Sequence, residues 1–168
     1  MNNKTKYLAH AALIAALYAV LTHLQNFLIP NSTSFAIQLR MSEALCVLAL
    51  FTPAAISGLT VGCLLFNLTF AAALPLDWLA GTAATLIAAL AMYALRNYRI
   101  KGYPLLSMVM PALSNAIFVG WELTVYIGGG FGINALYVAL GEAAVLLTLG
   151  SLLFRILERR GLARLLFH

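Results

Sequence analysis

Three glutamates stand inside stretches of sequence that are otherwise apolar: Glu43, Glu122 and Glu142. A charged side chain at mid-membrane costs about 2.5–3.5 kcal/mol on insertion scales, so each of these residues needs a partner, water or a bound ligand. The amides of Asn67 and Asn115 are also set in apolar sequence. Carboxylates and amides can grip a small polar molecule through several hydrogen bonds at once. The sequence therefore predicts a ligand site inside a lipid-embedded bundle.

The motifs of common enzymes do not accompany these residues. The sequence contains no HExxH, GxSxG or GxxxxGK[ST] pattern. Cys46 and Cys63 lack metal-ligand spacing, and the three histidines form no ligand motif. We therefore expect a binding protein with no metal and no cofactor, rather than an enzyme. A small membrane enzyme is the alternative, which turnover of a ligand without any partner protein would favour.

Each polar residue also has a purely structural explanation. Glu43 could help to cap a helix, with Arg40 pairing to it at the surface. The two asparagines could be hydrogen-bonding contacts between helices, and Glu142 could pair with a polar group across the bundle. Glu122 is the hardest to explain in this way, which makes it the best single candidate for a ligand contact.

The composition places these residues in an integral membrane protein. Of the 168 residues, 63% are hydrophobic and 9% are charged, whereas a soluble domain usually carries about 25% charged residues. Apolar segments of spanning length recur up to the C-terminal end, which a cleaved secretory signal does not explain. We expect an all-α bundle that forms a single membrane-embedded domain over residues 1–168.

The basic residues indicate which end of the bundle is cytoplasmic. Apart from Arg40, they fall in an N-terminal group, a group at 96–101 and a C-terminal group: Lys4, Lys6, Arg96, Arg99, Lys101, Arg155, Arg159, Arg160 and Arg164. Cytoplasmic loops carry an excess of such residues, and all three groups share one side only if the segment before Phe51 crosses the membrane. We expect six transmembrane helices with both termini in the cytoplasm. Because these groups flank membrane spans, we expect no nucleic-acid partner.

The six expected spans cover residues 7–29, 35–51, 52–74, 78–95, 103–127 and 133–157. Asp77 is expected to cap the fourth span, and Pro111 to kink the fifth. The polar stretch 30–35 is a connector or a lid over a pocket that opens outward. Asn115 and Glu122 are seven residues apart and therefore share one helical face. With this topology the buried polar side chains converge on one outward-facing pocket.

Aromatic residues stand close in sequence to the polar ones. Trp121, Tyr126 and Tyr137 could supply aromatic walls for the pocket. Trp78 is a further candidate, although tryptophan at the edge of a span is more often an interfacial anchor than a ligand contact.

Small residues line one face of the first span: Ala12, Ala15, Ala16 and Ala19. Small residues four apart let another helix approach closely. That helix could belong to this chain or to another subunit, and the two interpretations are equally compatible with the sequence.

The stretch 38–68 resembles a known family. It carries RMSEAL at 40–45, FTPAAI at 51–56, GL at 58–59, GC at 62–63 and NL at 67–68. In these motifs the chain is similar to the queuosine-precursor transporter family (QueT type), whose members are substrate-binding S components of energy-coupling factor (ECF) transporters. Ser57 departs from the pattern, since proline is expected there. The similarity in length and span pattern extends over most of the chain.

The resemblance implies six helices and a multi-pass protein of the bacterial cell membrane. It implies a transmembrane scaffold subunit and two ATPase subunits as partners, with the alanine face of the first span as the docking surface. It also implies a deazaguanine ligand. A carboxylate can accept from the adjacent N–H groups of a guanine-type edge, and a second carboxylate can balance the cation of an aminomethyl form. An S component for another small vitamin is the alternative.

In this interpretation Glu122 or Glu43 binds the guanine-type edge, and Asn67, Asn115 and Trp121 support it. The full set of candidate substrate-binding residues is Arg40, Glu43, Asn67, Trp78, Asn115, Trp121, Glu122 and Glu142.

Overall fold

The computed structural model describes residues 2–30, 32, 38–70, 73, 75–159 and 161–167. Within these ranges every regular element is a helix, apart from an isolated bridge between Ile100 and Tyr103. The elements are α1 (Asn3–Leu28), the 3₁₀-helix η1 (Met41–Leu50), α2 (Ala54–Thr69), α3 (Pro75–Ala94), α4 (Leu105–Tyr126), α5 (Phe131–Val145), the π-helical η2 (Leu146–Gly150), α6 (Ser151–Arg159) and α7 (Leu162–Phe167). The expected all-helical fold is confirmed.

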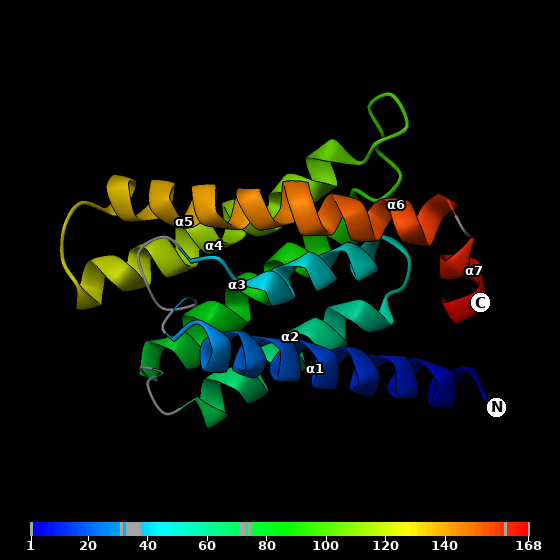
Figure 1. Cartoon of the computed structure of the whole chain (residues 1–168), viewed down its shortest axis with the longest axis horizontal. Coiled ribbons are helices and arrows are strands. Elements are labelled where there is room, and N and C mark those ends of the chain that lie inside the picture. The colour runs from blue at the N-terminus through cyan, green and yellow to red at the C-terminus, as the bar shows by residue number, and fades with distance from the viewer. Residues whose placement is uncertain are drawn as a thin grey trace.

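The elements lie along one long axis, and both termini are at the same end of the bundle (Figure 1). Along this axis α1, η1, α2, α3, α4 and the α5–α6 helix follow one another in alternating directions (Figure 1). Four helices are long and apolar enough to cross a membrane: α1, α3, α4 and the helix Phe131–Arg159, which joins α5, η2 and α6. Because η1 and α2 are shorter, a count of six crossings stays a prediction.

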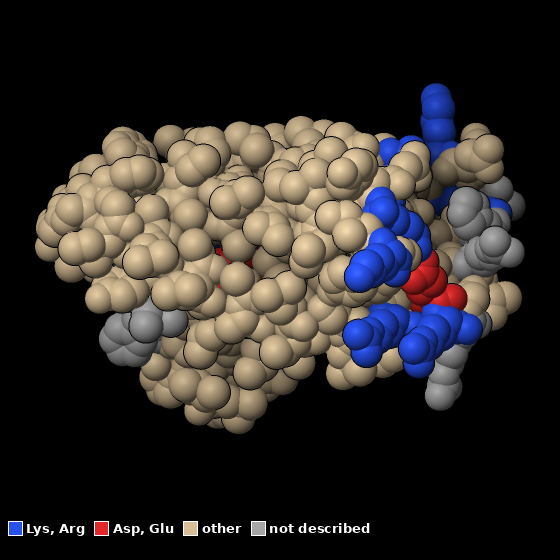
Figure 2. All heavy atoms as spheres, turned by 90° about the horizontal axis from the view of Figure 1, so that it is seen from above, with Lys and Arg blue, Asp and Glu red and all other residues tan. Residues whose placement is uncertain are grey.

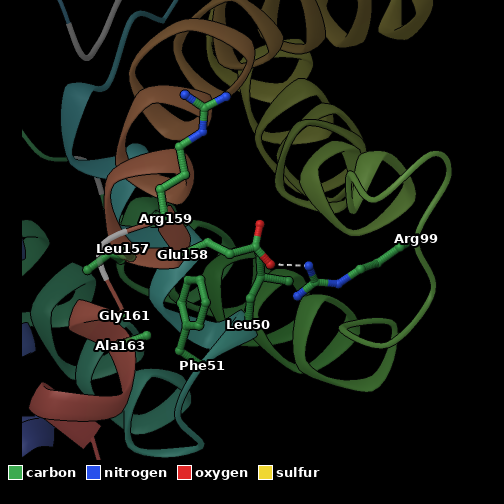
Figure 3. Close-up of a pocket in the computed structure, with 8 residues that line it drawn as sticks. All are labelled: Leu50, Phe51, Arg99, Leu157, Glu158, Arg159, Gly161 and Ala163. Carbon is green, nitrogen blue, oxygen red and sulfur yellow. Dashed lines mark hydrogen bonds and ion pairs between the residues drawn. The ribbon is translucent and has the colours of Figure 1, made fainter.

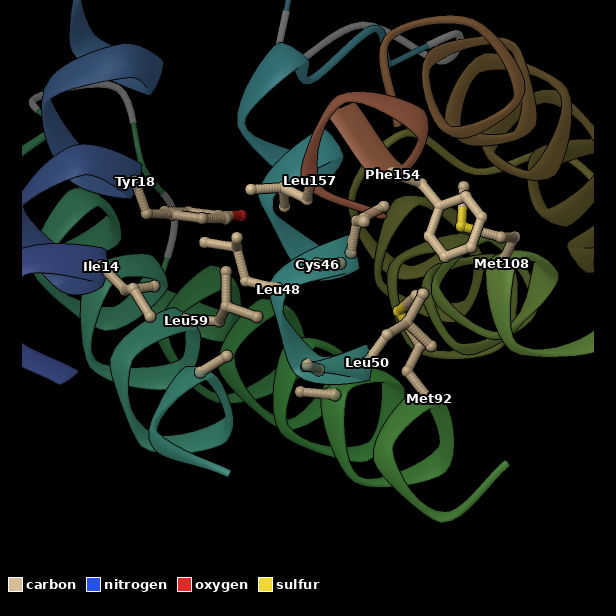
Figure 4. Packing of buried hydrophobic residues seen from close by; sticks show 14 of the residues in the cluster. Ile14, Tyr18, Cys46, Leu48, Leu50, Leu59, Met92, Met108, Phe154 and Leu157 are labelled. Carbon is tan, nitrogen blue, oxygen red and sulfur yellow. The ribbon is translucent and has the colours of Figure 1, made fainter. Parts of the chain in front are cut away.

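The second expected span is a buried 3₁₀-helix, so the prediction of an α-helix here is wrong. A 3₁₀-helix rises about 2.0 Å per residue against about 1.5 Å for an α-helix, so ten residues cover about 20 Å instead of about 15 Å. Eight of the ten residues of η1 are buried. Figure 4 shows Cys46, Leu48 and Leu50 of this segment packed among side chains of the surrounding helices. This packing stabilises a 3₁₀-helix of ten residues, although 3₁₀-helices longer than three or four residues are uncommon. The proposed extension back to residue 35 is wrong at 38–40, where the chain is not helical and Arg40 is extended. Residues 35–37 of the extension lie outside the described residues, as does most of the 30–35 loop.

Two boundaries differ from the expected ones. α2 ends at Thr69, and Phe70 is already extended, so the third span does not continue as a helix to residue 74. α3 begins at Pro75, a position where proline is favoured because its fixed φ suits the first turn and its missing N–H is not needed. Asp77 therefore lies within the first turn of α3 and not at the N-cap position that the sequence suggested.

Two glycines bring the backbones of α1 and α2 together. A Cβ on Gly58 would lie 2.7 Å from the carbonyl oxygen of Ala11, and one on Gly62 would lie 2.8 Å from that of Ala15. Ala15 is buried in this contact, whereas Ala12 and Ala16 are exposed and Ala19 is half-buried. The alanine face is thus divided, with one side packed within the chain and the other left outside.

The basic side chains on the face shown in Figure 2 gather at the end that carries the termini. Arg99, from the hairpin between α3 and α4, forms an ion pair with Glu158 of α6 (Figure 3). The pair borders a pocket of about 560 Å³ that Phe51 and Leu157 also line (Figure 3). Acid and base already neutralise each other there, so this pocket differs from the buried polar residues at mid-bundle.

Candidate functional site

A polar stripe on α1 fixes the segment that leads into η1. Tyr18, Thr22 and Gln25 are spaced four and three residues apart and so lie on one face of the helix. Gln25 accepts a hydrogen bond from the backbone N–H of Met41 at 2.7 Å and donates to the carbonyl oxygen of Leu39. The hydroxyl of Thr22 lies 2.7 Å from that of Ser42. These contacts hold residues 39–42 against α1.

The opposite side of the same segment is closed by α5. A Cβ on Gly141 would lie 2.4 Å from the carbonyl oxygen of Gln38, so only glycine allows the two backbones to approach this closely. The segment is therefore clamped between α1 and α5. This clamp sets the position of Arg40 and presents it beside Glu142, the residue that follows the glycine.

Glu43 is an interior residue with its own partners. Its carboxylate accepts hydrogen bonds from the hydroxyl of Tyr18 and from the thiol of Cys46, the latter at 3.0 Å. Residues three apart eclipse each other in a 3₁₀-helix, which places Cys46 directly beneath Glu43. Figure 4 shows the Tyr18 hydroxyl pointing from α1 toward η1. Glu43 and Arg40 are both buried, so the explanation as a surface ion pair is wrong.

We predict that Tyr18→Phe lowers the stability of the protein. The change removes one of the donors to a buried carboxylate, which costs about 1–3 kcal/mol. Thermal unfolding in detergent measures the effect. Tyr7→Phe is the matched control, because the Tyr7 hydroxyl makes an exposed 2.9 Å hydrogen bond to Ser57. Equal stability losses in the two variants would show that Tyr18 does not support Glu43.

Glu142 and Asn115 are buried polar residues that form no well-placed hydrogen bond within the described ranges. Their side chains are each 1% exposed, and both carboxylate oxygens of Glu142 and both amide atoms of Asn115 lack a partner among the described residues. The Glu142 carboxyl group lies within hydrogen-bonding reach of the Asn115 amide, and Arg40 is near enough to interact electrostatically with Glu142 and with Glu43. Buried polar groups are nearly always hydrogen-bonded. Glu142 and Asn115 therefore have hydrogen-bonding capacity for a ligand.

Glu122 and Asp77 form a second acidic group between α4 and α3. Glu122 is 2% exposed, and its carboxyl group lies within hydrogen-bonding reach of the Asp77 carboxyl group. One carboxylate oxygen of Glu122 has no partner within the described ranges. The Asn67 amide donates to the backbone carbonyl of Asp77 at 2.7 Å. Asn67 thus acts as the predicted interhelical contact, because it ties α2 to the first turn of α3.

The aromatic candidates are outside these groups. Trp121 is 49% exposed and Trp78 is 42% exposed, and Tyr137 is exposed as well. Tyr126 is exposed too, and its hydroxyl accepts from the backbone N–H of Leu76 at 3.1 Å. The structure therefore brings the predicted acids and amides into the interior, but it does not add tryptophan side chains to them.

Three polar residues of α1 contact the site but were not among the predicted site residues. Tyr18, Thr22 and Gln25 form a polar stripe on an otherwise apolar helix, which the spacing alone reveals. The proximity of Asp77 to Glu122 has no counterpart in the sequence, because it depends on how α3 packs on α4.

The unpartnered groups define what the site can bind. A carboxylate with two free oxygens accepts from two adjacent N–H donors, and an amide or guanidinium nearby donates to a carbonyl oxygen. Glu142 and Asn115 offer this carboxylate and this amide, and Arg40 is a charged neighbour that interacts with Glu142 and Glu43. A flat heterocycle with neighbouring N–H and C=O groups on one edge matches it.

Comparison with protein families finds a match over most of the chain. The model of the QueT transporter family matches residues 8–159, a range that contains every candidate site residue. Comparisons with the curated proteins and with the solved structures gave no match.

Proposed function

The chain belongs to the QueT transporter family, and we propose from this that it is the substrate-binding S component of an ECF transporter for a queuosine precursor. The family and the four long apolar helices make it a multi-pass membrane protein. They point to transport rather than to catalysis. The proposed partners are a transmembrane scaffold subunit and two ATPase subunits, which provide the energy for import.

The observation that carries the proposal is that the Glu142 carboxyl oxygens and the Asn115 amide atoms lack a hydrogen bond in the part of the chain that the structure describes. Leaving a buried polar group without a hydrogen bond costs about 1–3 kcal/mol, and more when the group is charged. A deazaguanine relieves this cost, since its N1–H and amino group suit a carboxylate and its carbonyl oxygen suits the Asn115 amide or Arg40. Glu142 thereby takes the edge-binding role that the sequence suggested for Glu122 or Glu43.

The proposed topology lets the ligand enter from outside. Basic side chains gather at the end that holds both termini (Figure 2), and that end is cytoplasmic by the positive-inside tendency. Glu122 lies about one turn from the end of α4 at Tyr126, away from the basic end. The acidic groups are therefore nearer the outer side, in a bundle that crosses the membrane six times.

The exposed alanines of α1 support the proposed scaffold contact. Ala12 lies in an apolar groove of about 260 Å³, which Tyr7, Leu8, Ala11, Ala15, Ser57 and Val61 also line. In this proposal Ala12 and Ala16 meet the scaffold subunit, while Ala15 contacts α2 within the chain.

A ligand panel tests the proposed function. We expect the purified protein to be stabilised in thermal-shift assays by deazaguanines, with aminomethyl-deazaguanine among them, and not by an equal concentration of thiamine, riboflavin or biotin. Ligand binding to the folded state raises the unfolding temperature by mass action. Stabilisation by one of the vitamins alone would indicate an S component of different specificity. Turnover of a ligand without partner subunits would indicate an enzyme.

A further inference from the structure

Building on the proposed function, we infer that Glu122 and Asp77 form a cation site that selects a positively charged substituent on the ligand. The deazaguanine with an aminomethyl arm carries such a group, whereas its cyano analogue does not. This site is distinct from Glu142 and Asn115, which bind the ring edge.

The two acids are held together by contacts from three helices. Asp77 is fixed in the first turn of α3 by the 2.7 Å hydrogen bond that its carbonyl oxygen accepts from Asn67 of α2. Gly81 makes room for that amide, since a Cβ there would lie 3.0 Å from the Asn67 nitrogen. Glu122 reaches the Asp77 carboxyl group from α4 and keeps one oxygen without a partner in the part of the chain that the structure describes. That oxygen is free to accept from a ligand.

The balance of charge also calls for a cation. Glu43, Glu122 and Glu142 are buried, and Asp77 is half-buried beside Glu122. Among the lysines and arginines whose side chains the structure describes, Arg40 alone is buried. It already interacts with Glu43 and Glu142 and also acts on Glu122. Burial favours the neutral, protonated form of such acids, and a protonated amine on the ligand supplies the charge that stabilises the carboxylate form of Glu122.

The spacing suits one ligand that spans both groups. Asn115 and Glu122 are seven residues apart on one face of α4, which is a rise of about 10 Å. A bicyclic base with a one-carbon arm covers this length when it has a hydrogen bond at each end. The ring edge then lies at Asn115 and Glu142, and the amine lies at Glu122 and Asp77.

The experiment compares two ligands on matched variants. Affinities for aminomethyl-deazaguanine and for cyano-deazaguanine are measured on the wild type, Glu122→Gln, Asp77→Asn and Glu158→Gln. We expect the wild type to prefer the aminomethyl form by roughly tenfold or more, the gain typical of a hydrogen bond to a charged group. Glu122→Gln is expected to remove most of this preference, and Asp77→Asn part of it. Affinity for the cyano form should stay within about twofold to threefold, and Glu158→Gln, which breaks an exposed ion pair, should change neither affinity.

The outcomes separate this inference from the proposed function. Wild-type protein that binds neither compound contradicts both. Wild-type protein that binds both compounds, with a preference that Glu122→Gln leaves unchanged, contradicts the cation site and leaves the proposed function intact. Binding of the cyano form also reports that each variant is folded. If Glu122→Gln binds neither compound, the test rests on Asp77→Asn. An unchanged preference of that variant for the aminomethyl form over the cyano form overturns the inference.

Discussion

Replacement of Glu142 by glutamine is expected to weaken deazaguanine binding by roughly 100-fold without destabilising the free protein. The carboxylate offers two acceptors to the ring edge, and a hydrogen bond to a charged group contributes about 1.5–3 kcal/mol. Glutamine keeps one acceptor and turns two donors toward the N–H groups of the ligand. In the free protein the substitution replaces a buried acid, which is costly to ionise there, by a neutral amide of the same size, so stability should hold or rise.

The test measures ligand affinity and thermal unfolding on the same preparations. Glu158→Gln is the matched control, because it neutralises an acid in an exposed ion pair at the other end of the bundle. A purely structural role for Glu142 predicts the opposite result, with lower stability and unchanged affinity. That result would remove Glu142 from the ligand site.

Among substitutions that add a single methyl group to this protein, Gly141→Ala is expected to cause the largest loss of stability. The new Cβ would lie 2.4 Å from the carbonyl oxygen of Gln38. That oxygen belongs to the backbone, so the strain cannot be relieved by rotating a side chain. Overpacking of this kind costs about 1–3 kcal/mol. Because the displaced segment carries Arg40, we expect ligand affinity to fall together with stability.

Gly132→Ala provides the comparison within the same helix. A Cβ at Gly132 meets no described atom within 4 Å, and alanine favours helix over glycine by up to about 1 kcal/mol. We therefore expect Gly132→Ala to be neutral or slightly stabilising and to bind ligand normally. Unfolding temperatures and ligand affinities of the two variants test this. Similar behaviour of both variants would show that α5 does not clamp the segment.

The long helices were predictable because their apolar runs are long enough to define them. α1, α4 and the α5–α6 helix begin and end within a few residues of the expected spans. The short segments were not predictable to the same degree. The eleven residues from Met41 to Phe51 do not distinguish a 3₁₀-helix from an α-helix, since the choice for η1 is made by the helices that surround it. Proline in the first turn also moved the start of α3 and took Asp77 away from the cap.

Part of the candidate site could be predicted from the residue types and their apolar surroundings in the sequence. Buried positions for Glu43, Glu122 and Glu142 were implied by acids in apolar sequence, and the structure places all three inside. The sequence did not imply which of these acids already accepts hydrogen bonds and which has oxygens without a partner in the described residues. That distinction depends on contacts between distant parts of the chain, such as Tyr18 with Glu43 across 25 residues. Trp121, which was expected as a pocket wall, is exposed in the structure, because sequence neighbours in an α-helix point about 100° apart.

The two tryptophans of the chain are the sequence neighbours of the two acids in the inferred cation site: Trp78 follows Asp77, and Trp121 precedes Glu122. Both indoles lie on the outside of the bundle, while the acids face inward or are half-buried. The protein thus carries its own optical reporters next to the position of an arriving amine. Their emission will respond to small shifts of α3 and α4, and brominated lipids will quench them from the hydrocarbon side without competing for the ligand.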